Sequence, residues 1–215
     1  MIKYPEVHLT GSSQARRDSR AARGFKLCET WWDSKELIMD GPNSERLLNW
    51  LNVEQSERYQ REPSKTFCNI YAYDYCCQAG VYLPHVWWTW LAMNEIRKGE
   101  NIIPKYGVNI AELNANGLYN WLDSYSNMYH WKKVMEVPDA QEIVNKGHVG
   151  VVCGKGHIGH ISVIIPEWEN RKCTIDKFGN KILLQSQAGW ENKKTFSEDW
   201  YSQFKEYGFW VNIKE

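Results

Sequence analysis

Residues 148–167 read HVGVVCGKGHIGHISVIIPE, two short apolar runs on either side of a glycine-rich segment. Val and Ile favour strands, and Gly, Pro or Asn bound each run. The runs at 148–154 and 160–167 therefore predict two neighbouring strands. Similar runs at 181–189 (KILLQSQAG) and 208–215 (GFWVNIKE) predict further strands of the same sheet.

The first half of the chain carries helical patterns instead. In residues 41–59, apolar side chains recur at helical spacing behind a cap at Asn43 or Ser44. A second helix is expected from Thr66 to Gly80, which places Cys68 in its first turn.

Two more helices are expected, one opened by Pro84 and running to 99, and one at 109–125. A helical first half followed by a run of strands is typical of the α+β class, with the helices packed on an antiparallel sheet.

Length and charge limit the kinds of partner. A chain of 215 residues fits a single domain, and 26 Lys and Arg balance 26 Asp and Glu, so no overall charge attracts nucleic acid.

We expect an irregular basic arm at 1–30 and one domain at 31–215. In the arm, Arg16, Arg20 and Arg23 would share a helix face, which is either simply solvated or anchored to an anionic polymer.

From the distribution of apolar residues we expect neither a membrane-spanning segment nor a secretory signal. No apolar run approaches the roughly 20 residues that span a bilayer, and the N-terminal residues lack a hydrophobic signal core. The sequence therefore predicts a protein that is made in the cytoplasm and delivered by some other route if it acts outside.

The six cysteines do not form the paired spacing of a zinc ribbon. Without a secretory signal we expect most of them to be reduced and buried, with one available as a nucleophile. Twelve tryptophans, including Trp87 and Trp88, are expected either in the core or along a binding groove.

The heptapeptide GKGHIGH at 154–160 suggests three chemistries. Lys155 lies between strand-like runs rather than at a helix start, which excludes a phosphate loop, and HIGH lacks the context of a nucleotide-activating synthetase. A zinc site of Cys153, His157 and His160 remains open if the glycines form a tight loop. Otherwise His160 alone, at the start of a buried strand, carries the chemistry.

Cys68 and His160 together have the properties of a nucleophile and its base. A helix N-terminus and a neighbouring imidazolium both lower the pKa of a thiol. A base of this kind needs an acceptor that orients its other ring nitrogen. If residues 160–166 and 181–187 pair as antiparallel strands, the end of the second strand faces His160. Gln187 is then the first candidate for this acceptor, and Gln185, on the same face of the strand, is the second.

Four segments resemble, in order, the papain-like cysteine hydrolases of bacterial cell-wall turnover. They are KTFCNIYAYDYCCQAGVYLP, ELNANGLYNWL, DAQEIVNKGHVGVVCGKGHIGHISVIIPE and LLQSQAGW, within about residues 60 to 190. This group includes CHAP and NlpC-type amidases and peptidases, phage lysins and secreted antibacterial effectors. The resemblance implies a papain-like fold with Cys68 as nucleophile, His160 as base and Gln187 in third place. Because a neutral Gln cannot stabilise imidazolium as a carboxylate does, Asp176 is an alternative third residue.

The same resemblance implies a cysteine peptidase or amidase that hydrolyses amide bonds in peptidoglycan peptides. The expected substrate-binding residues are Asn69, Trp87, Trp88 and Trp190. No cofactor, nucleic acid or membrane span is expected, and the site of action is the bacterial cell wall after lysis or export, with a delivery or immunity protein as a further partner. Two alternatives stay open: a catalytically weak or inactive cell-wall- or glycan-binding module of the same fold, and the zinc hydrolase that uses Cys153, His157 and His160.

Overall fold

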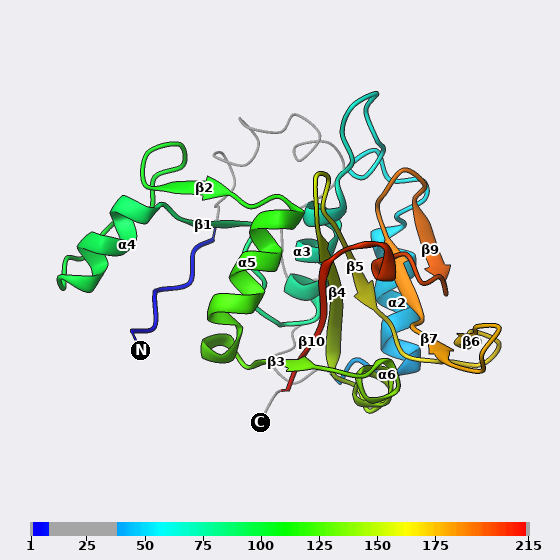
Figure 1. Cartoon of the computed structure of the whole chain (residues 1–215). Helices are drawn as coiled ribbons and strands as arrows, with labels where there is room; N and C mark the ends of the chain where they lie inside the picture. Colours follow the sequence, from blue (N-terminus) through cyan, green and yellow to red (C-terminus); the bar gives the residue numbers. More distant parts are fainter. Residues whose placement is uncertain (1, 9–37, 214–215) are drawn as a thin grey trace.

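The computed structural model describes residues 2–8 and 38–213 (Figure 1). The helices of this part are α2 (Gly41–Leu51), α3 (Cys68–Gln78), α4 (Trp90–Arg97), α5 (Ala115–Tyr125) and α6 (Val137–Asn145), with short 3-10 helices η1 (Ser126–Tyr129) and η2 (Tyr201–Gln203). The strands are β1 (Val86–Trp88), β2 (Ile110–Glu112), β3 (Trp131–Val134), β4 (Val149–Lys155), β5 (His160–Ile164), β6 (Thr174–Ile175), β7 (Lys181–Ile182), β8 (Gln185–Gln187), β9 (Lys193–Phe196) and β10 (Glu206–Asn212). Helices and antiparallel sheets in this order confirm the α+β class.

The central sheet has six antiparallel strands in the order β3-β10-β4-β5-β8-β9. Strands β4 and β5 pair directly, from Gly150 opposite Ile164 to Gly154 opposite His160. The glycine-rich segment is therefore the turn of a hairpin. The strands expected at 148–154 and 160–167 are confirmed as β4 and β5, and the strand expected at 208–215 is confirmed within the described residues as β10. The run at 181–189 divides into β7 and β8.

Each face of the sheet packs against its own helices (Figure 1). On β4, Val151 and Cys153 belong to the core cluster that includes residues of α3 and α5. Val152, between them, belongs to a second cluster with Ala140 and Val144 of α6. Since side chains alternate across a strand, a nearly continuous apolar run such as VVC needs cover on both faces.

Helix α3 runs through the middle of the molecule, where nine of its 11 residues are buried. It packs against β5 and β8 and also touches α2 and α5. The expected helix at 66–80 is confirmed, with Cys68 as its first residue. Ala79 follows the helix, and Gly80 then takes a positive φ of 69° that ends it.

Two expected helices begin later than the sequence predicted. The predictions for 84–99 and 109–125 each included a short strand, since β1 and β2 pair with Trp88 opposite Ile110. Each helix starts where a side chain caps it: Thr89 Oγ1 accepts from the Ala92 N–H, and Asn114 Oδ1 accepts from the Gly117 N–H. These local caps determine the helix starts, and the aromatic and β-branched residues before them pair as strands.

Helix α2 has a different cap from the one expected. Asp40 is the N-cap, and its Oδ1 accepts from the Asn43 N–H at 3.0 Å, so Asn43 and Ser44 lie inside the helix. A carboxylate also interacts favourably with the positive end of the helix dipole.

The first described segment belongs to the domain core. Tyr4 and Val7 are buried, Tyr129 Oη donates to the Tyr4 carbonyl, and Trp88 Nε1 donates to the Pro5 carbonyl at 2.9 Å. Residues 2–8 of the expected basic arm therefore pack as part of the domain. Arg16, Arg20 and Arg23 of that arm lie outside the described residues.

A buried ion pair joins α3 to the segment after α2. Arg58 Nε lies 2.6 Å from Asp74 Oδ2 and Arg58 Nη2 lies 3.0 Å from Oδ1, with both side chains almost fully buried. Tyr59 Oη also donates to Asp74, at 2.8 Å. Burial, followed by the negative charge of Asp74, raises the pKa of Tyr59 well above its usual value. The pair is thus held by two-point hydrogen bonding in a dry environment.

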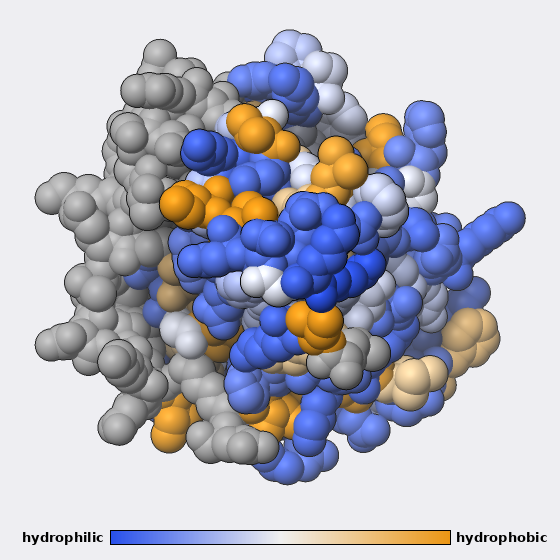
Figure 2. All heavy atoms as spheres, turned by 90° about the vertical axis from the view of Figure 1, so that its left-hand side faces the viewer, coloured by the Kyte–Doolittle hydropathy of each residue, from blue (hydrophilic) through white to orange (hydrophobic). Residues whose placement is uncertain are grey.

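The face that carries α4 exposes apolar side chains as separate spots among hydrophilic ones (Figure 2). The exposed large apolar residues of α4 and of the loop before β2 are Trp90, Leu91, Ile103, Tyr106 and Val108. Scattered exposure of this kind is normal for a protein surface. Among the described helices, none combines the length and apolar character needed to cross a membrane.

We predict that Asp74→Ala lowers the free energy of unfolding by about 3–5 kcal/mol, because it leaves a buried guanidinium uncompensated. Urea denaturation measures this. The control is Asp123→Ala, which breaks a partly exposed pair with Lys133 and should cost about 1 kcal/mol or less. Equal losses in the two variants would contradict the role given to the buried pair.

Candidate active site

Cys68 occupies the first position of α3 and is buried where the helix meets β5. Because it begins the helix, its backbone N–H has no acceptor within the helix. The N–H groups of Asn69 and Ile161 donate hydrogen bonds to the Cys68 side chain. The helix N-terminus and these donors all favour the negatively charged thiolate.

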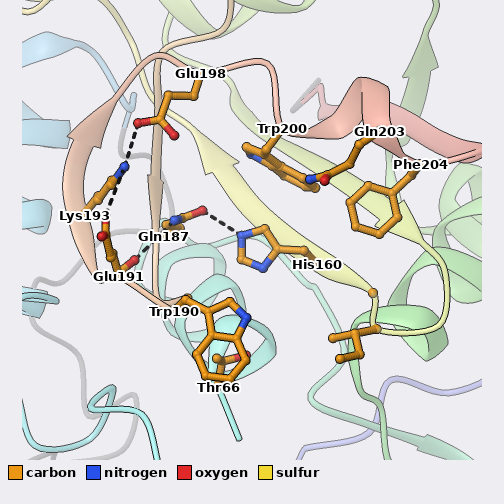
Figure 3. A pocket seen from close by; sticks show the side chains of 13 residues that line it. Thr66, His160, Gln187, Trp190, Glu191, Lys193, Glu198, Trp200, Gln203 and Phe204 are labelled. Atoms are coloured by element: carbon orange, nitrogen blue, oxygen red, sulfur yellow. Dashed lines mark hydrogen bonds and ion pairs between the residues drawn. The ribbon is translucent and has the colours of Figure 1, made fainter.

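His160, the first residue of β5, lies between Cys68 and Gln187. Its Nε2 is 2.7 Å from Gln187 Oε1 (Figure 3). A carbonyl oxygen only accepts, so His160 Nε2 is the donor, which leaves Nδ1 for the hydrogen bond to the Cys68 side chain. Strand β8 pairs antiparallel with β5, Val163 opposite Ser186, and this pairing carries Gln187 to His160. The structure thus brings together the three residues that the sequence singled out.

The electrostatics of the Cys68–His160 pair favour the ionised form. Burial opposes a charge on Cys68, but the hydrogen bond and charge of His160, together with the backbone N–H groups of Ile161 and Asn69, outweigh burial, and the pKa of Cys68 lies below its ordinary value. Burial likewise opposes a charge on His160, but the negative charge of Cys68 and the hydrogen bonds that His160 donates to Cys68 and Gln187 raise the pKa of His160. Each group shifts the other toward thiolate and imidazolium.

The other free cysteines of the described part behave in the opposite way. They are Cys76, Cys153 and Cys173, whereas Cys77 is disulfide-bonded. Burial raises the pKa of each, to about 11 for Cys173 and well above the usual range for Cys153. Cys68 is therefore the one described free thiol whose surroundings promote ionisation.

The two alternatives for the third residue lie elsewhere. Gln185 is fully buried, and its Oε1 accepts from Ser162 Oγ at 2.7 Å and from Trp200 Nε1 at 2.8 Å. Asp176 caps an exposed turn between β6 and β7, where it accepts from the Phe178 and Asn180 N–H groups. Gln187 is the residue that contacts His160.

Trp200 contributes to the site although nothing in the sequence indicated it. Its ring meets the His160 ring edge to face, with centroids 4.5 Å apart. Its Nε1–H is held by Gln185, which fixes the indole in place. An indole at this position restricts rotation of the imidazole and keeps water from one side of it. The residue lies in a loop 40 positions after His160 in sequence, and no local pattern marks it.

Two cavities open on either side of the Cys68–His160 pair. The His160-side cavity, about 440 Å³, is lined by His160, Gln187 and aromatic residues (Figure 3). The Cys68-side cavity, about 780 Å³, is lined by Cys68 and Asn69 among mostly polar residues. Four residues line both cavities and form the boundary between them: Thr66, Ile158, Gly159 and Trp190.

Of the four residues expected to bind substrate, two line these cavities. Asn69 and Trp190 do so, and Trp190 is 59% exposed. Trp87 and Trp88 do not, because both are buried in the core, where Trp87 packs against Trp121 and Tyr129. The expectation that Trp87 and Trp88 line the groove is wrong: β1 is buried along its whole length, so the side chains on both of its faces lie in the core.

A polar chain orients Asn69. Its Nδ2 donates to Glu112 Oε1 at 3.2 Å and to the Leu113 carbonyl at 3.0 Å. The same Glu112 oxygen lies 3.1 Å from Nε2 of the buried His85. With both amide hydrogens committed, the orientation of the Asn69 carboxamide beside the nucleophile is set.

The hairpin turn is held against α5 and does not gather the expected zinc ligands. Asn116 Nδ2 donates to the Gly156 carbonyl at 2.8 Å, and Gly156 N–H donates back to Asn116 Oδ1. A Cβ on Gly159 would lie 2.2 Å from the same oxygen, so only glycine fits there. Cys153 is buried and donates to the Ala115 carbonyl, while His157 is exposed. Across residues 2–8 and 38–213, no three side chains of the metal-binding types converge.

Comparison with known proteins returns no match, either to a family model or to a curated protein. The chemistry assigned to the site therefore derives from its own residues.

We predict that alkylation of Cys68 by iodoacetamide reaches half its maximal rate at lower pH than alkylation of an ordinary thiol, because the pKa of Cys68 is lowered. His160→Ala removes the hydrogen bond and charge of His160, which are the largest influences that lower the pKa of Cys68, while burial continues to raise it, so the midpoint moves to higher pH. Peptide mapping follows Cys68, with Cys173, whose pKa is raised to about 11, as the internal control. An unchanged midpoint in His160→Ala would contradict the coupling.

Proposed function

We propose that the protein is a cysteine amidohydrolase that cleaves amide bonds of peptides through Cys68 and His160. The observation that supports this most directly is a cysteine at a helix start, with a lowered pKa and a hydrogen bond to a histidine that Gln187 orients. The pair lies at the boundary of two cavities, so a substrate has access to it. Peptides of peptidoglycan are the proposed substrate class, by resemblance of the four sequence segments to cell-wall hydrolases.

In the first half of the reaction the Cys68 thiolate attacks the amide carbonyl carbon. The negative charge that develops on the carbonyl oxygen is stabilised by the Cys68 backbone N–H at the positive end of α3. His160, protonated at Nδ1, then gives this proton to the departing nitrogen, and the C–N bond breaks. The products are a free amine and an acyl group bound to sulfur.

In the second half, neutral His160 accepts a proton from water as that water attacks the thioester. The carboxylic acid leaves and the thiolate–imidazolium pair is restored. Gln187 keeps Nε2 protonated throughout, so Nδ1 is always the nitrogen that exchanges protons. The edge-to-face contact with Trp200 keeps the His160 ring in one orientation during these proton transfers.

We expect the wild-type protein to release soluble fragments from purified sacculi and Cys68→Ala to release none, because the nucleophile is missing. Mass spectrometry of the fragments identifies the bond. Cys173→Ser is the matched control, since Cys173 lies outside both cavities, and it should digest sacculi as the wild type does.

Identical fragment patterns from wild type and Cys68→Ala would exclude this activity. Binding to sacculi without cleavage, together with slow alkylation of Cys68, would instead support the non-enzymatic wall-binding module.

Gln187 has a predicted effect on the pH dependence. Gln187→Leu removes the acceptor for Nε2 and should lower kcat by on the order of 10²-fold. Gln187→Glu supplies a negative charge, which favours imidazolium and raises the pKa of His160. The loss of activity at alkaline pH, where His160 deprotonates, should then move to higher pH. A pH profile of kcat/KM measures both, and an unshifted alkaline limb would contradict the assignment.

A further inference from the structure

The two cavities divide the reacting pair between them. Among the described residues, the larger cavity is lined by Cys68 and the smaller by His160, and neither cavity is lined by both. In the proposed reaction the two sides of the substrate have different fates, because the acyl part becomes bonded to sulfur while the amine part receives a proton from His160. The reacting residue that lines a cavity therefore indicates which part of the substrate binds in that cavity.

We propose that the Cys68-side cavity binds the acyl part of the substrate, an extended polar peptide, and that the His160-side cavity binds the amine part, a group with an apolar or aromatic body and no negative charge. This inference rests on the proposed function. It assigns a direction to the substrate and a chemical class to each side.

The Cys68-side cavity has the composition of a peptide-binding groove. Its wall carries side-chain amides and charges: Glu62, Lys65, Asn69, Glu112, Asn114 and Asn116. Asn69 is held by Glu112 and the Leu113 carbonyl, so its own carbonyl is oriented to accept an amide N–H. Polar groups of this type, fixed in place, pair with peptide backbone and polar side chains.

The His160-side cavity is bounded by rings. Trp190, Trp200 and Phe204 line it, and Phe204 packs edge to face on Trp200 with centroids 5.7 Å apart. Flat apolar walls favour a leaving group with an apolar or aromatic body.

The charges of this cavity disfavour an anionic group. Lys193 Nζ lies 2.6 Å from Glu198 and 3.4 Å from Glu191, so one ammonium faces two carboxylates and a net negative charge remains. Both carboxylates are more than half exposed, which limits the effect through screening by salt.

An acceptor amine can enter the same cavity after the first product leaves. Its nitrogen attacks the thioester carbonyl, the C–S bond breaks, the excess proton on nitrogen passes to His160, and Cys68 leaves as the thiolate. The product is a new amide. Water and the amine therefore compete for the acyl group of the thioester. Binding of the acceptor in a preformed cavity makes this transfer saturable and selective.

The test uses a thiomethyl ester of an N-acetylated alanine peptide as acyl donor, because a small thiol leaving group does not fill the aromatic amine subsite. The acceptors are phenylalaninamide, glycinamide and glutamic acid 1-amide, whose amines are similar in basicity. We expect saturation by phenylalaninamide at about ten-fold lower concentration than by glycinamide, through burial of the phenyl ring. Glutamic acid 1-amide should bind about two- to five-fold more weakly than glycinamide, since exposed charges are screened.

Substitutions in each cavity test the two proposed subsites separately. Phe204→Ala should reduce the ten-fold acceptor preference to about three-fold or less, with Phe204→Leu as a milder replacement if Ala impairs folding. Tyr106→Ala, in the Cys68-side cavity, should raise the donor KM and leave acceptor preference unchanged. Val108→Ala, on the same loop as Tyr106 but outside both cavities, should change neither.

Product masses and released thiol distinguish the outcomes. Aminolysis that rises in proportion to concentration, equally for all three amines, overturns the amine subsite while leaving the hydrolase intact. A change of acceptor preference in Tyr106→Ala but not in Phe204→Ala overturns the direction. If the thioester never acylates Cys68 by intact mass, the proposed function fails and this inference with it.

Discussion

The packing of α3 against β5 and β8 is the constraint on which the rest of this site depends. A helix with nine of 11 residues buried cannot shift without opening the core, so its first residue is held at one point of the sheet. That point is where β5 begins, and Cys68 therefore meets His160. The Arg58–Asp74 pair anchors the middle of the same helix. Packing and ion pairing together position an atom whose chemistry depends on sub-ångström placement.

The site combines burial with charge, two requirements that oppose each other. Burial alone raises the pKa of a thiol, as it does for Cys76 and Cys153. Cys68 is just as buried, yet its pKa falls, because a histidine and two backbone N–H groups meet the sulfur. The pKa values of these cysteines therefore differ because of their hydrogen-bonding and charged partners, and not because of how far they are buried. A desolvated thiolate of this kind is reactive because few water molecules solvate it.

Much of this arrangement follows from local sequence patterns. Helix α3, strands β4 and β5 and the antiparallel approach of Gln187 to His160 could be predicted, because period, breakers and pairing direction are local properties. Trp87 and Trp88 were misplaced because an aromatic-rich run before a helix cap has no pattern that separates strand from helix. Trp200 was missed because its contact with His160 comes from the path of the chain after β9, and no sequence spacing records that path.

In the proposed mechanism Gln187 takes the third place in the site without adding a charge. A carboxylate in that position would favour imidazolium strongly, but it would also add an unpaired negative charge whenever His160 is neutral. With Gln187 in third place, the only charges within the triad itself are those of the Cys68 thiolate and the His160 imidazolium, and they cancel. The cost of burying them is offset by the helix N-terminus and the two N–H donors. In the proposed mechanism the imidazolium therefore gives up its proton to the amine without leaving a buried carboxylate unpaired, although the Cys68 charge and the hydrogen bonds favour the charged ring.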